Sequence, residues 1–235
     1  MKYTFPVLGW QGWTSSTSNP ASELPVYPDA DDGSTPALPF VPAMKRRRLT
    51  RLAKMALHVA EPLNGEGQLA TVFASQHGEV GQTVDMLDRL LAGEAVSPTR
   101  FSQSVHNFAS GSYGIHFSNT QASTSIAAGS DTLLMALIEG QSQLSADQDV
   151  LVVYMDEPVP ARFLTPAEPQ QPAMALALRL SLSASTRLLA RACEAPADHP
   201  PLTSVPWQVL RMLNSAAGGV VMQQERQRYH WSVSR

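Results

Sequence analysis

The chain has little cysteine and little charge. Cys193 is the only cysteine among its 235 residues, which excludes a disulfide framework and a cysteine-rich metal site. Charged side chains make up 16% of the chain, whereas they make up about 25% of an average soluble domain. Because the centres of protein interfaces are depleted in charge, this deficit favours a chain whose surface is partly covered by a partner. An unusually large buried fraction is the alternative interpretation.

The chain also lacks long apolar runs and an excess of basic charge. No stretch reaches the roughly 20 apolar residues that a membrane-spanning helix needs, and the first residues contain no apolar core of a secretion signal. We therefore expect a cytoplasmic protein without a membrane span. The net charge of −3 gives no electrostatic reason to expect a nucleic-acid partner.

Apolar periodicity predicts strands that alternate with helices, the pattern of an α/β layered sheet. We interpret residues 1–235 as one domain, because this length can bury a single large core. Six prolines between residues 20 and 42 predict a surface loop over residues 13–42, since proline sustains neither a helix interior nor a central strand. Residues 158–235 are expected to add a strand, a helix and a tail. The predicted strands are 2–10, 69–74, 150–154 and a half-buried antiparallel strand at 174–182, and the predicted helices are 47–60, 79–92, 98–108 and 205–214.

A strand, a tight turn and a helix follow one another around Gly129. Residues 123–126 have the pattern of a short strand, and residues 130–144 have the pattern of a helix. This arrangement resembles the nucleophile elbow of the β-ketoacyl synthases, which carry Thr-Ala-Cys at the turn. In those enzymes the thiol lies at a helix N-terminus, where the helix dipole favours a thiolate. Gly129 occupies the cysteine position, so the resemblance implies that no nucleophile is present there.

Other segments resemble the same family at matching spacings. Residues 147–152 align without a gap with the family's Asp-Ala-Asp-Val strand, and Glu157 aligns with the glutamate that closes that strand. Upstream, Ser97-Pro98, Phe101 and residues 107–111 resemble the family's Ser-Pro, aromatic and Asn-x-x-Ala-Gly pattern. A narrower group, the short ketoacyl-synthase-like chain length factors found with aryl polyene pigment pathways, is also resembled at residues 10–13, 45–49 and 102–107.

The resemblance implies a thiolase-like α/β fold, a single half of the duplicated ketosynthase fold with a mixed sheet layered by helices. The family's catalytic histidines and lysine lie in the other half and have no counterpart here. The implied protein is therefore a non-catalytic chain length factor that forms a heterodimer with a catalytic β-ketoacyl synthase. It would shape the acyl tunnel of that synthase in polyene or fatty-acid-like biosynthesis on an acyl carrier protein. The alternatives are a homodimeric scaffold of a synthase complex and a residual decarboxylase or hydrolase.

The resemblance also implies two functional surfaces. The strand at residues 122–126 is expected to pair with the equivalent strand of the synthase, in an interface made of Ala122, Ser123, Thr124, Ser125, Ile126, Phe101, Asn107 and Phe108. The helix at residues 79–92 is expected to set the product length, because its apolar arc is wider than a one-sided surface helix needs. Part of the arc would cover this chain's own sheet, and ordinary core packing of the whole arc is the alternative. The expected tunnel residues are Gln76, His77, Val80, Thr83, Val84, Met86, Leu87 and Leu90.

Six of the 17 basic residues lie within ten positions of the chain. A basic patch accelerates encounter with an acidic partner, and acyl carrier proteins are acidic. The candidate carrier-protein patch consists of Lys45, Arg46, Arg47, Arg48 and Arg51. Pairing of these side chains with carboxylates of the partner subunit or of this chain, and a solvated helix start, are the alternatives.

Three other patterns do not support the metal, dinucleotide or hydrolase site that each one suggests. The His-Gly-Glu at residues 77–79 contains the H-x-E of zinc deaminases, but a chain with one cysteine cannot supply the P-C-x-x-C that completes that site. The glycines at positions 65 and 67 precede a predicted strand, so they cannot place a dinucleotide at a helix N-terminus. Ser102 and His106 share a helix face, but no acidic residue is evident to orient the histidine. We therefore predict no metal and no cofactor.

Overall fold

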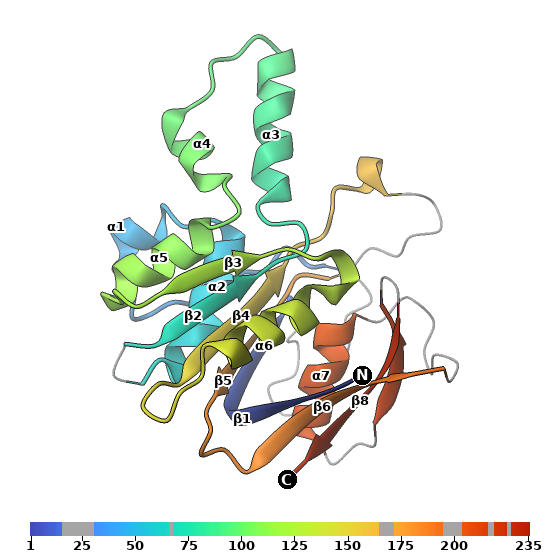
Figure 1. Ribbon diagram of the computed structural model, residues 1–235. Coiled ribbons are helices and arrows are strands. Elements are labelled where there is room, and N and C mark those ends of the chain that lie inside the picture. The colour runs from blue at the N-terminus through green and yellow to red at the C-terminus, as the bar shows by residue number, and fades with distance from the viewer. Residues whose placement is uncertain (16–30, 66–67, 165–171, 195–203, 216–218, 225–226) are drawn as a thin grey trace.

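Within the described residues the chain forms one mixed sheet of eight strands, in the order β3-β2-β4-β5-β1-β6-β8-β7 (Figure 1). The computed structural model describes residues 1–15, 31–65, 68–164, 172–194, 204–215, 219–224 and 227–235. Strands β3, β2 and β4 are parallel, and the other neighbouring pairs are antiparallel. The strands are β1 (Lys2–Thr14), β2 (Ala70–Ala74), β3 (Ser123–Ile126), β4 (Val150–Asp156), β5 (Met174–Leu180), β6 (Thr186–Cys193), β7 (Val220–Gln223) and β8 (Arg228–Ser234).

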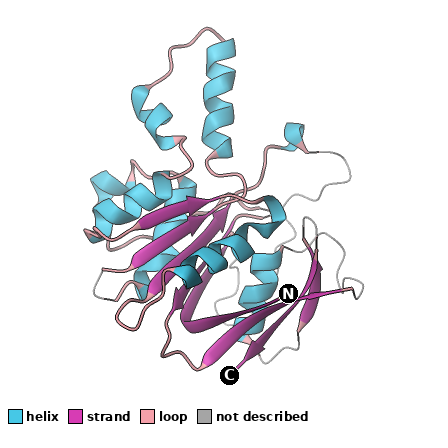
Figure 2. Ribbon diagram, in the orientation of Figure 1, coloured by secondary structure: helices cyan, strands magenta, loops and turns pink. Residues whose placement is uncertain are grey.

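Helices cover both faces of the sheet (Figure 2). Helices α2 (Arg51–Ala60) and α5 (Phe108–Phe117) pack in one apolar cluster, and α6 (Thr132–Ser142) and α7 (Val205–Asn214) pack in the other. Strand β5 lies between the two clusters, with its leucines in one and its alanines in the other. The expectation of a half-buried strand is therefore wrong, because the small alanine face lies under α2 instead of facing solvent. The helix predicted at 205–214 is confirmed as α7.

Helix α2 begins later than predicted. The sequence predicts one helix over residues 47–60, but a short helix α1 (Ala43–Arg46) is followed by a turn, and α2 starts at Arg51. Thr50 ends the turn because its Oγ1 accepts a hydrogen bond from the backbone N–H of Ala53 at 3.1 Å, the usual geometry of a helix N-cap. Two of the described residues in the expected surface loop, Leu38 and Val41, are buried against the α2 side of the sheet.

Helices α3 (Val80–Leu91) and α4 (Pro98–Gln103) project from the body of the molecule (Figure 1). We call residues 80–103 the arm. The helix predicted at 79–92 is present as α3, but it does not cover the sheet as expected, since Met86 is its only buried residue. The single helix predicted over 98–108 is wrong: the chain breaks after α4, where His106 Nε2 donates to the carbonyl oxygen of Ser75 at 3.0 Å.

The region after residue 158 is richer in strands than predicted. Besides β5 and α7 it forms β6, β7 and β8, which extend the sheet beyond β1. Strand β8 does carry a sequence signal, because Tyr229, Trp231 and Val233 alternate with polar residues, as in a half-buried strand. Three one-turn helices complete the described elements: η1 (Glu61–Leu63), η2 (Gly129–Asp131) and η3 (Ala161–Phe163).

Candidate functional site

The carboxyl ends of the three parallel strands lie at one end of the sheet, which we call its carboxyl edge. In open α/β folds ligands bind at this position. Strand β3 ends at Ile126, β2 at Ala74 and β4 at Asp156. The segments that follow these strands carry the elbow, the turn before the arm, and Glu157. The sequence-predicted features at Gly129, residues 76–79 and Glu157 are therefore brought to the same edge.

The predicted elbow is present. After β3 the chain turns at Gly129, whose φ of +54° is left-handed, a conformation that glycine adopts with little cost. Thr132 closes the turn, because its Oγ1 accepts from the N–H of Ala128 at 2.9 Å and donates to the carbonyl oxygen of Gly129 at 2.6 Å. Helix α6 then follows. The turn after the strand thus has a conformation that suits glycine, and Gly129 places no side chain there.

The antiparallel pair of strands β7 and β8 is linked to the elbow by hydrogen bonds. Gln224, which is buried, donates from Nε2 to Asp131 Oδ1 at 3.0 Å and to the carbonyl oxygen of Ser130 at 3.3 Å. Its Oε1 accepts from Trp231 Nε1 at 3.1 Å. These bonds join β7 and β8 to residues almost a hundred positions earlier. The sequence analysis missed this contact, and a lone glutamine near the end of a strand carries no signal for it.

Asp156 fixes the turn that leads into the arm. Its Oδ1 accepts from Ser75 Oγ at 2.6 Å and from the N–H of His77 at 3.1 Å. Its Oδ2 accepts from the N–H of Gln76 at 2.9 Å and from Tyr154 Oη at 2.5 Å. Gln76 and His77 were predicted as tunnel residues, and both side chains are exposed. Asp156 was not among the predicted site residues, although a carboxylate at the end of a buried strand is a general signal for such a site.

Two acidic side chains are buried next to this turn. Glu79 is 3% exposed, and its Oε1 accepts from Thr50 Oγ1 at 2.6 Å, whereas Oε2 has no hydrogen-bond partner among the described residues. Burial raises the pKa of the Glu79 carboxyl to about 8, an effect that the Thr50 hydrogen bond opposes. Burial also raises the pKa of Glu157, which Arg51 opposes. Among the described residues at this edge, the carboxylates of Glu79 and Glu157 lie near a single arginine, Arg51, which is already paired with Asp31.

The predicted basic patch divides into two parts. Arg51 binds Asp31 through two nitrogens, each at 2.7 Å, and its side chain is only 17% exposed. It also lies 3.6 Å from Glu157, so for Arg51 the alternative of pairing with this chain's own carboxylates is the correct one. Arg46 donates to the carbonyl oxygen of Leu38 at 3.0 Å. The exposed remainder consists of Lys45, Arg47 and Arg48.

Several large apolar side chains of the arm are exposed to solvent in the single chain. The exposed fractions are 50% for Leu87, 54% for Leu90, 87% for Leu91 and 64% for Phe101. The alternative that the whole arc is ordinary core is thus wrong, because Met86 is the only buried residue of α3. Clusters of this kind on a soluble protein usually mark a binding surface. Ion pairs brace the arm: Asp85 with Arg89 and Arg100, Arg89 with Glu94, and Asp88 with Arg162.

Within the part of the chain that the structure describes, strand β3 is an edge strand, and its side away from β2 is unpaired. The carbonyl oxygens of Ala122 and Ile126 accept from N–H groups at the two ends of β2. Because successive backbone groups alternate between the two edges of a strand, the N–H and C=O groups of Ser123 and Ser125 point away from β2. Among the other predicted interface residues, Phe101 and Asn107 are exposed, whereas Phe108 packs against this chain's own core.

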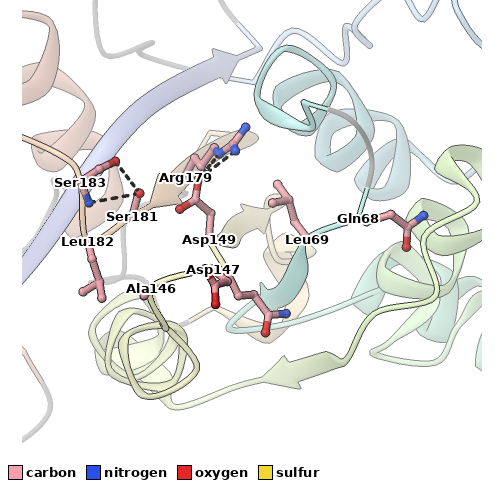
Figure 3. A pocket seen from close by; sticks show the side chains of 10 residues that line it. Gln68, Leu69, Ala146, Asp147, Asp149, Arg179, Ser181, Leu182 and Ser183 are labelled. Atoms are coloured by element: carbon pink, nitrogen blue, oxygen red, sulfur yellow. Dashed lines mark hydrogen bonds and ion pairs between the residues drawn. The ribbon is translucent and has the colours of Figure 1, made fainter.

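A polar hollow of about 320 Å³ lies at the opposite edge of the sheet, near the amino ends of β2 and β4 (Figure 3). Arg179 and Asp149 lie side by side in its wall, with Arg179 Nε donating to Asp149 Oδ2 at 2.8 Å (Figure 3). The hollow contains none of the predicted site residues. Because its arginine is already neutralised, it offers little affinity for an anion.

Two further findings concern the described part of the chain. No group of three or more histidine, cysteine, aspartate or glutamate side chains is placed to hold a metal ion there. No described helix is both long enough and apolar enough to span a membrane.

Residues 10–232 match the family described as "Beta-ketoacyl synthase, N-terminal domain". Among solved structures, the chain resembles one from the ketosynthase ApeO in complex with its chain length factor ApeC from Xenorhabdus doucetiae. That match is 25% identical with a TM-score of 0.78, and it covers 98% of this chain and 99% of the other. No curated protein matches the chain.

Two more distant structures show the same fold. The ishigamide ketosynthase/chain length factor is 17% identical with a TM-score of 0.54, and the match covers 81% of this chain and 68% of that one. A β-ketoacyl synthase from Burkholderia phymatum STM815 is 12% identical with a TM-score of 0.56, and the match covers 91% and 70%. At these identities the likeness concerns the fold alone.

Proposed function

The chain belongs to the β-ketoacyl synthase family, and from this premise we propose that it is a non-catalytic chain length factor for a separate, catalytic synthase. The fold is the thiolase-like ketosynthase fold, in the form of a single half, as predicted. The proposal goes beyond the family in three respects: the lack of catalysis, the heterodimer, and the shaping of an acyl tunnel.

The elbow is the observation that carries the proposal. It keeps the strand, the left-handed turn and the helix, and in the alignment inferred from the sequence a glycine takes the position of the family's thiol. A condensing enzyme needs an activated nucleophile at this point. A chain that preserves the shape of the elbow without the nucleophile is better suited to complement another active site than to form its own. The almost complete match to a chain from a ketosynthase–chain length factor complex supports the same role.

The arm supplies the surface for setting product length. Val80, Thr83, Leu87 and Leu90 recur at intervals of three and four residues, so they lie along one side of α3. Thr83, Leu87 and Leu90 are exposed, and Val80 is partly exposed. In the proposed complex this side of α3 lines the end of the partner's acyl tunnel. Elongation stops when another two-carbon unit would overpack the closed end.

Changing the size of this stripe should change the product of the co-expressed pair. Thr83→Phe is expected to shorten the longest product by at least one two-carbon unit, because the larger ring occupies the tunnel end. Leu90→Ala is expected to lengthen it. The measurement is mass spectrometry of the released chains, with melting curves of the purified complex alongside.

Gln82→Phe provides the matched control, since residue 82 lies about 100° around the helix from residue 83 and on the side away from the stripe. It should leave the product length unchanged. If all three variants give wild-type lengths in a complex of wild-type stability, α3 does not line the tunnel.

The exposed basic residues Lys45, Arg47 and Arg48 are proposed to receive the acidic acyl carrier protein. The double variant Lys45→Glu/Arg47→Glu is expected to weaken carrier binding by the complex about tenfold or more at low salt, and less at high salt, because exposed charges are screened. Arg191→Glu, which reverses another exposed basic residue, is the control. Equal carrier affinities for both variants, measured by titration calorimetry, would place the carrier elsewhere.

A further inference from the structure

The arm is attached to the body through a polar root. The root consists of residues 75–79, which enter the arm, and residues 104–107, which leave it. Gly78 has a φ of +57° and donates from its N–H to Ser75 Oγ at 2.7 Å. His106, on the leaving segment, binds the carbonyl of Ser75 on the entering one. With Met86 as the only buried residue of α3 and none buried on α4, hydrogen bonds of the root hold the arm more than apolar packing does.

The charges around the root do not balance. Glu79 starts α3 and is buried, Glu157 and Asp156 follow from the end of β4, and Asp31 approaches from the loop before α1. The cation at this cluster is Arg51 of α2, and both of its terminal nitrogens are already bound to Asp31. The remaining titratable groups of the root are His77, beside Glu79 in the same turn, and His106 on the leaving segment.

The protonation state of Glu79 decides whether a charge is buried at the root. As a neutral acid it can remain buried against Thr50 with only one accepted hydrogen bond. As an anion it would bring a second negative charge close to Glu157, and the described residues supply no hydrogen-bond donor to its Oε2. A buried, unpaired charge is costly, and the least costly relief is movement of a segment that brings the carboxylate to water.

We propose that Glu79 is a proton-operated latch: protonated, it docks the arm on the body, and ionised, it releases the arm. The device concerns the arm's attachment and does not depend on which protein the arm binds. The direction of the pH effect follows from the burial of Glu79: loss of its proton favours the released state, in which the carboxylate reaches water, so a rise in pH favours release. The raised pKa of Glu79, about 8, places the transition within reach of ordinary buffers.

Hydrogen exchange of the full chain between pH 6 and pH 9.5 tests the latch. Protection of residues 80–103, normalised at each pH to the intrinsic exchange rate, should fall by up to about tenfold per pH unit between pH 6 and pH 8, because the released arm has lost a proton that the docked arm keeps. Protection should level off above about pH 8, where Glu79 is ionised in both states, and this break in the profile is the transition. Glu79→Gln keeps a neutral side chain of similar size and should remove this pH dependence. Glu94→Gln, an exposed acid on the arm itself, should keep the wild-type profile.

A second variant makes the test independent of whether Glu79→Gln folds. Glu157→Gln removes the negative charge that disfavours ionisation of Glu79, so ionisation becomes easier and the transition should move to lower pH. The latch is wrong if protection of the arm in the wild-type chain is the same at every pH. It is equally wrong if Glu157→Gln leaves the transition in place or moves it upward.

Discussion

Ser125→Pro is expected to abolish co-purification of this chain with its synthase while leaving the chain itself folded. In the proposed complex, the free edge of β3 pairs with the equivalent strand of the partner and joins two sheets into one. The N–H of Ser125 points to that free edge, because its neighbours bond to β2. Proline removes this donor and places its ring where the partner strand would lie.

The folded state of the single chain should tolerate the same change. Proline occurs on edge strands where the missing N–H faces solvent, and no described side chain receives a hydrogen bond from Ser125. Thr124→Pro would be a poorer test, because by the same alternation its N–H faces β2, and its loss would unfold the local sheet. Comparing the melting curve of the Ser125→Pro chain with wild type separates lost binding from lost structure.

Ser125→Ala is the matched control, since it removes the hydroxyl and keeps the backbone N–H. It should co-purify with the synthase at the wild-type yield. If Ser125→Pro also does so, β3 is not part of the interface.

The same preparations test the scaffold alternative. A stable homodimer that Ser125→Pro disrupts, with no capture of a synthase by the wild-type chain, would favour a scaffold over a chain length factor.

The sequence predicted well those features in which each residue acts locally. The strand and turn at residues 123–129 combine two β-branched residues, Thr124 and Ile126, with a glycine that suits a left-handed turn, and both strand and turn are present. Helix α7 starts with Pro206 near its N-terminus and keeps its apolar periodicity to Asn214, so its limits could be predicted. In each case propensity and tertiary contacts favour the same structure.

Features that depend on distant contacts were predicted poorly. Thr50 is a possible N-cap in the sequence, but the residue type alone does not decide between a helix that begins at Arg47 and one that begins at Arg51. The same hydroxyl also donates to Glu79, a contact that only the folded chain supplies. The arc on α3 resembles a core helix in its periodicity, since the apolar pattern of a helix does not state what covers it. Gln224 reaches the elbow only because β7 and β8 fold back over it.

Replacing Glu79 with glutamine should stabilise the chain, and the gain should grow with pH. The folded-state pKa of Glu79, about 8, lies above its ordinary value of 4.5. Between these two values the folded chain holds a proton that the unfolded chain has lost. Stability of the wild-type chain therefore falls as pH rises through this window, with a slope of up to about 1.4 kcal/mol per pH unit, and levels off above pH 8.

Glutamine carries no titrating proton, so the variant lacks this loss of stability. At pH 4 the two chains should unfold at similar denaturant concentrations, because both side chains are neutral in both states. By pH 8 the variant should be more stable by a few kcal/mol, on the order of the pKa difference converted at about 1.4 kcal/mol per unit. Glu157 has a pKa raised in the same direction. Because folded Glu79 is mostly neutral below about pH 8, as glutamine is, the contribution of Glu157 is nearly the same in the two chains over this range.

Urea unfolding at pH 4, 6 and 8 measures the effect, and Glu61→Gln is the control. Glu61 lies exposed at the start of η1, so its replacement should give the same small change at every pH. A Glu79→Gln gain that does not increase between pH 4 and pH 8 would mean that Glu79 is already ionised in the folded chain. In that case the carboxylate must find a donor for Oε2, and the root of the arm would be held by an anion instead of a neutral acid.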